Sequence, residues 1–392
     1  MTSEWHEVPL RELVGFISKG IAPSYAEEAS ETTIRVLNQK CNRNFRISYG
    51  DSRLHDTMKK KVSPERYVKP DDILINSTGA GTAGRIAQIE DVPSATTIDG
   101  HMILIRSNGK VTQKFLGYAL KAHQWEVLQL DEGSTGQTEL NRDRLLDEIM
   151  INYPVSFDEQ NAIVGTLESI DRKLIVNEQL NDNLQQQATA LFSSLYDRSN
   201  TEVRFTDLIQ ILGGGTPKTG ESTYWNGNIA FFTPKDVGTP YTLITEKNIS
   251  EEGLSHCNSR LYPVNTVFVT ARGTVGKVGI SGVPMAMNQS CYALVGKETH
   301  QLLVYFYTLK AVDRLKHKAS GAVFDAITTR DFESEQIMKL SDDDAKAFLC
   351  IAEPMFQKVL NNCIENLRLS TLRDSLLPKL MSGEIDVSAI QL

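Results

Sequence analysis

The sequence predicts an α+β protein: two β-rich domains are separated by two long helices that form an antiparallel coiled coil, and the whole is a pseudo-twofold internal repeat. Three observations predict this class. A glycine-rich motif occurs twice, 192 residues apart; each copy follows a run of β-branched and apolar residues; and each half ends in a long segment with heptad periodicity. A chain of 392 residues has room for two or three domains.

The repeat is visible at several places along the chain. The motif GTAGRIA at 81–87 corresponds to GTVGKVG at 273–279. The offset between the copies drifts from 195 to 188 residues, as expected if loops gained and lost residues after a tandem duplication. The other matched segments are KGIAPSY at 19–25 with GGTPKTG at 214–220, IRVLNQK at 34–40 with IAFFTPK at 229–235, and RDRLLDEIM at 142–150 with RDFESEQIM at 330–338.

Each copy begins with a β-rich domain, expected at 1–154 and 201–340. The segments KPDDILINSTGA at 69–80 and YPVNTVFVTARG at 262–273 each place a turn before a β-branched run, and glycines follow. VFVTARGTVGKVGI therefore predicts a strand, a tight turn and a second strand, with glycines that permit positive φ and a close approach of the backbone.

Each copy ends in a helical region, expected at 155–200 and 341–392. Adding 185 to each core position of the first region gives the matching position of the second. In an antiparallel pairing we expect Asn177 to meet Asn366 and Asn181 to meet Asn362, because asparagine at a core position lowers stability but fixes register. Two amphipathic helices packed on separate domains remain the alternative. The core positions of the first copy are Ile163, Leu167, Ile170, Leu174, Asn177, Asn181, Leu184, Ala188, Leu191 and Leu195, and those of the second are Phe348, Ala352, Met355, Val359, Asn362, Asn366, Leu369, Arg373, Leu376 and Leu380.

Charge and composition narrow the function classes. The formal net charge of −8 lies entirely in 155–200 and 333–392, so the β-rich domains are neutral and can still present cations on one face. No apolar run is long enough to span a membrane and no secretory leader is recognised, so we expect a soluble, cytoplasmic protein without a membrane partner. Five scattered cysteines predict neither disulfides nor a metal site. Cations cluster at Lys59, Lys60, Lys61, Arg66 and Lys69, at Arg260, Arg272 and Lys277, and at Lys310, Arg314, Lys316 and Lys318.

No catalytic constellation is recognised in the sequence. The glycine pattern at 215–220 lacks the lysine of a P-loop, and GAGTAG at 79–84 continues into a strand where a dinucleotide fold needs a helix. The chain has no Pro-Pro dipeptide for the clamp of an amino-methyltransferase. Asp171-Arg172-Lys173 fits the fragment of a metal-dependent nuclease but lies on the heptad helix without a second carboxylate.

The duplicated loops carry residue types that read DNA bases. Arginine and lysine pair with guanine, asparagine and glutamine with adenine, and aspartate with cytosine. Ordinary turns of a β-rich domain would explain the glycines equally well. They explain less well why the glycine-rich loops are duplicated beside a helical spacer.

The sequence resembles the specificity subunits of type I restriction-modification enzymes over essentially its whole length. The motifs that carry the resemblance are LRELVGFISKG with FTDLIQILGGGTPKT, STGAGTAGRIA with TARGTVGKVGI, the helix DEQNAIVGTLESIDRKLIVNEQLNDNLQQQATALFSSLY, and the ending LRDSLLPKLMSGEIDV. The resemblance implies two target recognition domains separated by helical conserved regions that act as a ruler. It also implies a bipartite DNA motif whose fixed spacer should lengthen if the coiled coil is lengthened.

The same resemblance implies the partners and the cofactors. Double-stranded DNA, two modification subunits and a restriction subunit are the expected partners. This chain would bind no cofactor and no metal, because S-adenosylmethionine, ATP and Mg²⁺ belong to the partner subunits. The alternatives are a coiled-coil scaffold without DNA specificity and a free-standing DNA methyltransferase. Neither the DNA motif nor the spacer length follows from the sequence.

The candidate DNA-binding residues lie on the loops of both domains. In the first domain KGIAPSY departs from the fuller GGGTPKT of the second, so its loop is expected to contact DNA differently. The candidates of the first domain are Asn38, Lys40, Ser77, Thr78, Thr82, Arg85, Asp99 and His101, and those of the second are Thr216, Lys218, Lys235, Asp236, Arg272, Thr274, Lys277, Asn288 and Gln289.

Overall fold

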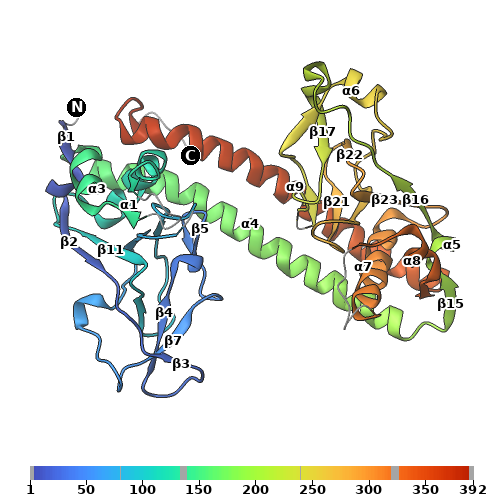
Figure 1. Ribbon diagram of the computed structural model, residues 1–392, viewed down its shortest axis with the longest axis horizontal. Helices are drawn as coiled ribbons and strands as arrows, with labels where there is room; N and C mark the ends of the chain where they lie inside the picture. Colours follow the sequence, from blue (N-terminus) through green and yellow to red (C-terminus); the bar gives the residue numbers. More distant parts are fainter. Residues whose placement is uncertain (1–3, 80, 133–138, 239, 319–325, 388–392) are drawn as a thin grey trace. The chain divides into compact units, whose positions relative to one another are not determined.

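The computed structural model describes residues 4–79, 81–132, 139–238, 240–318 and 326–387. The chain divides into two compact units, Met1–Arg172 with Leu369–Leu392 and Lys173–Arg368. Two long helices, α4 (Phe157–Asp197) and α9 (Asp342–Met381), each contribute residues to both units (Figure 1). The sequence predicts four segments with boundaries at the ends of the helical regions, whereas the two units are defined by contacts between residues and divide both long helices. The division into four segments stays a prediction.

The first unit holds two four-stranded sheets. One has the strand order β2-β11-β8-β9 and is antiparallel throughout; the other has the order β10-β4-β7-β3, with β10 parallel to β4. Strands β1 (Trp5–Pro9) and β14 (Met150–Pro154) pair separately. The bounds are β2 Val14–Lys19, β3 Tyr25–Ala26, β4 Thr33–Leu37, β5 Asn42–Arg43, β6 Arg46–Ile47, β7 Arg53–Asp56, β8 Ile73–Asn76, β9 Ile86–Gln88, β10 Thr96–Ile98, β11 Met102–Ser107, β12 Asp131–Glu132, β13 Glu139–Leu140, α1 Gln113–Ala122, α2 Gln124–Val127 and α3 Arg142–Glu148, with 3-10 turns at Leu10–Glu12, Gln39–Cys41 and Pro64–Arg66.

The second unit repeats this topology. Its larger sheet has the order β16-β23-β20-β21-β18, its smaller sheet the order β19-β17-β22, and β15 pairs with β24 as β1 pairs with β14. Strand β22 runs parallel to β17, as β10 runs parallel to β4. The bounds are β15 Thr201–Arg204, β16 Ile209–Gly213, β17 Trp225–Phe232, β18 Tyr241–Thr242, β19 Lys247–Ile249, β20 Val267–Thr270, β21 Val278–Ser281, β22 Met285–Met287, β23 Cys291–Gly296, β24 Gln336–Lys339, α5 Phe205–Leu208, α6 Glu251–Ser255, α7 Gln301–Lys318 and α8 Thr329–Ser334, with a 3-10 turn at Ser222–Tyr224.

The strand order confirms the internal repeat and the predicted fold class. In each unit the last strand of the larger sheet leads into a helix, α1 or α7. The first residue of each helix is a glutamine that binds that strand: Gln113 Nε2 donates to Ile105 O at 3.1 Å, and Gln301 Nε2 donates to Leu294 O at 2.7 Å. These two residues therefore mark equivalent positions of the copies.

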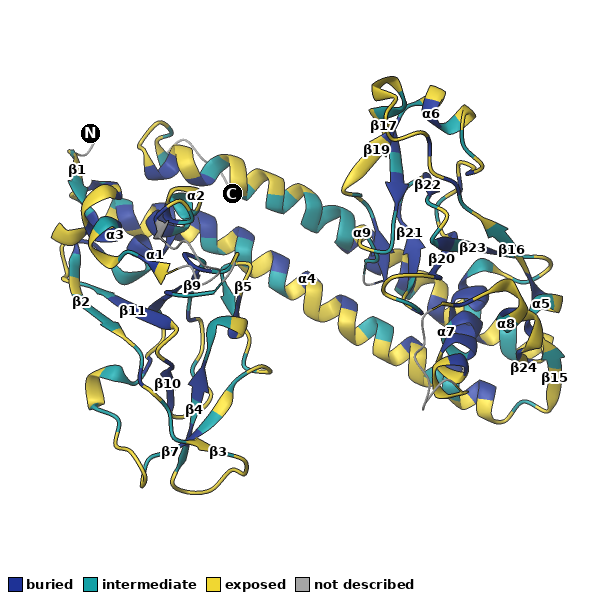
Figure 2. Cartoon of the chain, in the orientation of Figure 1, coloured by how far each residue is buried: buried dark blue, intermediate teal, exposed yellow. Residues whose placement is uncertain are grey.

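The long helices run antiparallel within each unit, because partner residue numbers rise on one helix and fall on the other. In the second unit Asn177 Nδ2 donates to Asn366 Oδ1 at 2.8 Å, and Asn362 Nδ2 donates to Asn181 Oδ1 at 2.8 Å. These are the two pairs expected from the heptads. All twenty core positions are buried or half-buried, while the other faces of both helices are largely exposed (Figure 2).

Each unit builds its core from one domain and the helical segments beside it. In the first unit Ile163, Leu167 and Leu380 pack with Phe115 of α1. In the second unit Ala188, Phe192, Phe348 and Phe356 pack with Phe306 of α7, and Phe192 and Phe306 stack with ring centroids 5.0 Å apart. Burial of aromatic and aliphatic side chains thus attaches each domain to the helical seam.

Candidate nucleic-acid interface

The hairpins β8–β9 and β20–β21 carry the twinned glycine-rich motif. Asn76 N donates to Arg85 O at 2.9 Å, and Thr270 N donates to Lys277 O at 3.0 Å. Both turns use glycine at positive φ: Gly84 at 82° and Gly276 at 73°. Since residues with a Cβ rarely adopt this conformation, the sequence motif and the turn are directly linked. Arg85 and Lys277 thereby occupy equivalent positions.

A second loop lies beside each hairpin, just before β11 and β23. Asp99 Oδ1 accepts from His101 N at 2.9 Å, and Asn288 Oδ1 accepts from Ser290 N at 3.0 Å. Such a local turn is typical of aspartate and asparagine. The backbone joins this loop to the hairpin in both copies, because Ser77 N donates to His101 O and Ala271 N donates to Ser290 O, each at 2.8 Å.

The loop after β2 or β16 approaches the same place through a glycine. A Cβ on Gly20 would lie 2.1 Å from Asp99 O, and one on Gly214 would lie 2.1 Å from Asn288 O. No side chain fits at either distance, so glycine is required in KGIAPSY and in GGGTPKT alike. Although KGIAPSY has fewer glycines than GGGTPKT, the two loops meet equivalent neighbours.

In the first domain the candidate residues divide into surface and buried groups. Thr78 Oγ1 lies 2.6 Å from His101 Nδ1, and His101 is exposed. Ser77 is fully buried and Asp99 is 3% exposed, and burial raises the pKa of Asp99. These two side chains therefore lie in the interior of the loops, where they can hold the loop backbone.

The remaining first-domain candidates hold the loop backbone or face solvent. Asn38 caps the turn Gln39–Cys41 by accepting from Lys40 N at 2.9 Å, and its Nδ2 donates to Asp51 O at 2.7 Å. Lys40 is exposed. Arg85 Nη2 donates to Gly81 O at 3.1 Å, and Thr82 Oγ1 donates to Gly79 O at 3.3 Å.

In the second domain most candidates are exposed. Thr216 Oγ1 donates to Gln289 Oε1, which joins the glycine loop to the loop before β23. Asp236 accepts from Thr233 N at 2.8 Å and from Glu246 N at 2.8 Å, so its carboxylate closes its own loop. The exposed candidates of this domain are Thr216, Lys218, Lys235, Arg272, Thr274, Lys277 and Gln289, while Asp236 and Asn288 are half-buried.

Some of the exposed cations form an ion pair with a carboxylate and others do not. Lys235 Nζ lies 3.4 Å from Glu246 Oε2. Within the described part of the chain, Lys40, Lys218, Arg272 and Lys277 form no ion pair with a carboxylate. Unpaired, solvated cations beside tight backbone turns suit contact with a polyanion.

The cation cluster on α7 has internal partners instead. Arg314 Nη1 donates to Gln336 O at 2.7 Å, Lys318 pairs with the buried carboxylate of Glu335, and Lys310 Nζ lies 5.1 Å from the centroid of the Tyr196 ring. These three side chains hold α7 against the rest of the second unit.

Sequence reasoning missed two residues of these sites. Gln39 lies between Asn38 and Lys40, and its Oε1 accepts from Thr78 Oγ1 at 3.4 Å. Thr270 Oγ1 accepts from Lys277 N at 2.9 Å and donates to Thr274 O, which shapes the second hairpin turn. Gln39 lies in the segment IRVLNQK between two candidate residues, but its contact with Thr78 depends on the fold.

The described residues contain neither a metal-binding cluster nor a membrane-spanning helix. No group of three or more His, Cys, Asp or Glu in the described ranges comes together in a way that could hold a metal ion. No helix within those ranges is both long and apolar enough to span a membrane.

Two copies of one fold, each with an equivalent cluster of glycine-rich loops and exposed cations, define a protein with two related loop surfaces. The chain belongs to the family of type I restriction modification DNA specificity domains, whose model matches residues 2–186 and 198–339. The family resemblance stated from the sequence motifs is thereby confirmed.

Individual relatives agree with the family. The chain is 32% identical over 127 residues to the type I restriction enzyme MjaIX specificity subunit of Methanocaldococcus jannaschii, which covers 31% of this chain and 29% of that protein. It is 28% identical over 185 residues to the HindI specificity subunit of Haemophilus influenzae, which covers 46% of this chain and 40% of that protein. The alignments therefore span less than half of each of these relatives.

The fold has a solved counterpart. The type I restriction-modification S subunit from M. genitalium superimposes with a TM-score of 0.62 at 15% sequence identity, covering 97% of this chain and 96% of that one. At this identity the similarity establishes the fold alone.

Proposed function

We propose that this chain is the DNA specificity subunit of a type I restriction-modification complex, and that it reads a bipartite, asymmetric DNA motif with a fixed spacer. The observation that carries the proposal is the duplication of the loop cluster. Each unit presents a glycine hairpin with a cation at the equivalent position, Arg85 or Lys277, and family membership connects such domains with DNA specificity.

The loops offer both kinds of contact that a DNA reader needs. Exposed Lys40, Lys218 and Lys277 suit the phosphates, which position a protein without reading sequence. Arg272, Gln289 and His101 are exposed polar side chains that suit base edges. The loops of the two domains differ in sequence, so the two half-sites are proposed to differ.

In this proposal the partner subunits, and not this chain, catalyse the reactions. Two modification subunits would bind S-adenosylmethionine and methylate a flipped adenine at N6, and a restriction subunit would consume ATP with Mg²⁺. This chain would be non-catalytic and cytoplasmic, and its helical regions would set the spacing between the half-sites.

Competition binding tests the proposal in vitro. The chain is co-expressed with its modification subunit, and retention of a labelled DNA fragment carrying the motif is challenged with unlabelled fragments. We expect a fragment with both half-sites to compete on the order of 10³-fold better than a fragment of scrambled sequence. Equal competition by both fragments would contradict a specificity role, and a coiled-coil scaffold without DNA specificity would then be the remaining function.

A further inference from the structure

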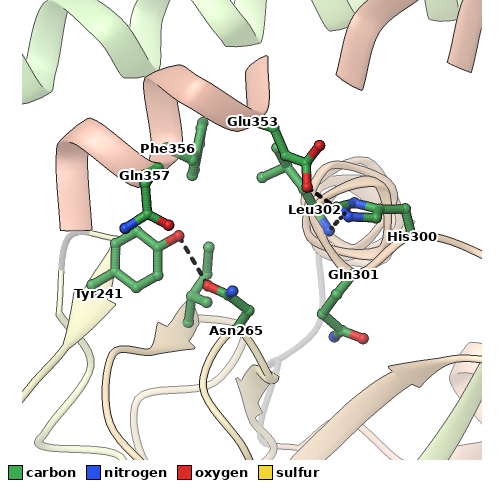
Figure 3. A pocket seen from close by; sticks show the side chains of 9 residues that line it. Tyr241, Asn265, His300, Gln301, Leu302, Glu353, Phe356 and Gln357 are labelled. Carbon is green, nitrogen blue, oxygen red and sulfur yellow. Dashed lines mark hydrogen bonds and ion pairs between the residues drawn. The ribbon is translucent and has the colours of Figure 1, made fainter. Parts of the chain in front are cut away.

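The second unit contains a small polar pocket between α9, the start of α7 and the turn before β20. It has a volume of about 120 Å³, room for several waters or for the end of one long side chain. The rings of Tyr241 and Phe356 form part of its wall, with centroids 6.5 Å apart (Figure 3).

Glu353, whose side chain is 58% exposed, is the carboxylate among the nine residues that line this pocket, and none of the nine is a lysine or an arginine. Glu353 Oε1 lies 3.0 Å from His300 Nε2. His300 Nδ1 accepts from Leu302 N at 3.3 Å, which leaves Nε2 to donate to Glu353. The second oxygen of Glu353 has no hydrogen-bond or ion-pair partner among the residues that line the pocket.

The equivalent place in the first unit is filled by a lysine. Asp71 and Asn265 are equivalent, because each lies two residues before a strand of the larger sheet at positive φ, 68° and 70°. Lys114 and Leu302 follow the glutamines that mark the starts of α1 and α7. Glu168 and Glu353 are related by the constant heptad offset of 185.

In the first unit these three positions form an ion-pair network. Lys114 Nζ lies 2.6 Å from Glu168 Oε1 and 4.0 Å from Asp71 Oδ1. In the second unit Leu302 provides no cation and Asn265 no charge, while Glu353 remains. Asn265 Oδ1 instead accepts from Tyr241 Oη at 3.2 Å.

From this substitution pattern we propose that the pocket lined by Tyr241, Asn265, His300, Glu353 and Phe356 binds the guanidinium or ammonium group of an arginine or lysine side chain from a partner protein. The carboxylate supplies the counter-charge, the two rings supply π faces for a cation, and Asn265 supplies an amide oxygen. The entering cation takes the position that Lys114 holds in the first unit. The identity of the partner as the modification subunit rests on the proposed function, whereas the chemistry of the pocket does not.

The pocket is tested on the full-length chain alone. The protein is labelled with ¹³C on the histidine rings, of which there are seven, and the His300 signal is assigned with His300→Gln. N-acetyl-arginine methylamide is the probe, and N-acetyl-citrulline methylamide is its uncharged isostere. We expect a saturable shift of the His300 signal with the arginine probe and none with the citrulline probe.

Variants separate this pocket from general charge effects. Glu353→Gln removes the counter-charge and Leu302→Lys restores the arrangement of the first unit, so each is expected to abolish the shift. Glu168→Gln, the matched carboxylate of the first unit, is expected to leave the shift unchanged. Equal shifts with both probes, or a shift that persists in Glu353→Gln, would overturn the proposal.

The source of the cation is tested in the complex. Leu302→Lys and Glu353→Gln are each expected to weaken binding of the co-expressed modification subunit by about tenfold, the loss of one charge-assisted contact. Unchanged affinity in both variants would overturn the assignment to a partner side chain. If the wild-type complex shows no DNA sequence specificity while the probe shift is present, only the proposed function is contradicted.

Discussion

Arg272 is the residue whose role is most directly testable. Its side chain is exposed at the turn of the β20–β21 hairpin, and no carboxylate in the described ranges pairs with it. If it donates to a guanine, Arg272→Ala should cost about 1–3 kcal/mol of binding and relax one position of the motif. Competition binding against fragments changed at each position measures this.

Lys218→Ala provides the matched control for Arg272. Lys218 is an exposed cation of the neighbouring glycine loop and is proposed to contact phosphate. Its loss should weaken binding to every fragment alike and reduce the salt dependence of binding. An Arg272→Ala variant that behaves in the same way would rule out base reading by Arg272.

An ion-pair cluster in the first unit, whose charged side chains are 10% to 18% exposed, gives a second prediction at the residue scale. Asp171 lies 2.9 Å from Arg373 and 3.2 Å from Lys121, and it accepts from Tyr118 Oη at 2.8 Å. Burial opposes its charge, but Lys121 and Arg373 together hold the pKa of Asp171 below its ordinary value. Removing Asp171 leaves Lys121 without its carboxylate partner and Arg373 with only the exposed Asp374.

Asp171→Asn should therefore lower the free energy of unfolding by about 3 to 5 kcal/mol at neutral pH. A carboxylate with a lowered folded pKa contributes stability above its unfolded pKa and loses it as the pH falls through the folded pKa. The difference between wild type and variant should thus shrink below about pH 4. Denaturant unfolding across this range measures it. Asp374→Asn, the exposed partner of Arg373, should cost no more than about 1 kcal/mol, and equal losses in both variants would contradict the account.

This cluster also shows what the sequence did not predict. The heptads placed Arg373 at the core position equivalent to Ala188, and the offset relates Asp171 to Phe356. Where the first unit has Tyr118 bound to Asp171, the second has Phe306 and Phe356 with centroids 5.5 Å apart. The seam was predictable from periodicity, but its polar contacts join residues far apart in sequence and leave no local signal.

At the scale of elements, the paired asparagines act on helix register. Asn362 is fully buried, and its Oδ1 has no hydrogen-bond partner in the described structure, so the pair with Asn181 lowers stability. We expect the double variant Asn181→Leu/Asn362→Leu to unfold at a higher temperature, because an apolar pair replaces a buried polar one.

The single variant Asn362→Leu should have the opposite effect. It leaves the amide of Asn181 buried without its partner, which costs about 1–3 kcal/mol. Differential scanning calorimetry compares the two variants, with Asn361→Leu on the exposed face of α9 as the control. A double variant less stable than Asn362→Leu would contradict a direct contact between the two amides.

The elements themselves were largely predictable where the pattern is local. Glycine spacing and β-branched runs predicted both hairpins, and heptads predicted both long helices, because each signal depends on neighbouring residues. The strand orders were not predicted, since pairs such as β10 with β4 join segments about 60 residues apart. For the same reason the burial of Ser77 and Asp99 became apparent only in the fold.

At the scale of the whole molecule, duplication connects the fold with the proposed function. Two copies of one topology carry equivalent loops with different side chains, which suits two different half-sites. The repeat was predicted from the sequence because indels changed its offset by only a few residues. The bases that each copy recognises could not be predicted from the sequence, because recognition depends on individual loop side chains and on DNA shape.

A map of N6-methyladenine across the genome, by long-read sequencing, tests the specificity role most directly. The source strain is compared with a strain that lacks this gene and with the same strain after complementation. We predict that one split motif with a fixed spacer loses methylation in the deletion strain and regains it on complementation. A map in which that motif stays methylated in the deletion strain, while the modification subunit is expressed and active, would contradict the account.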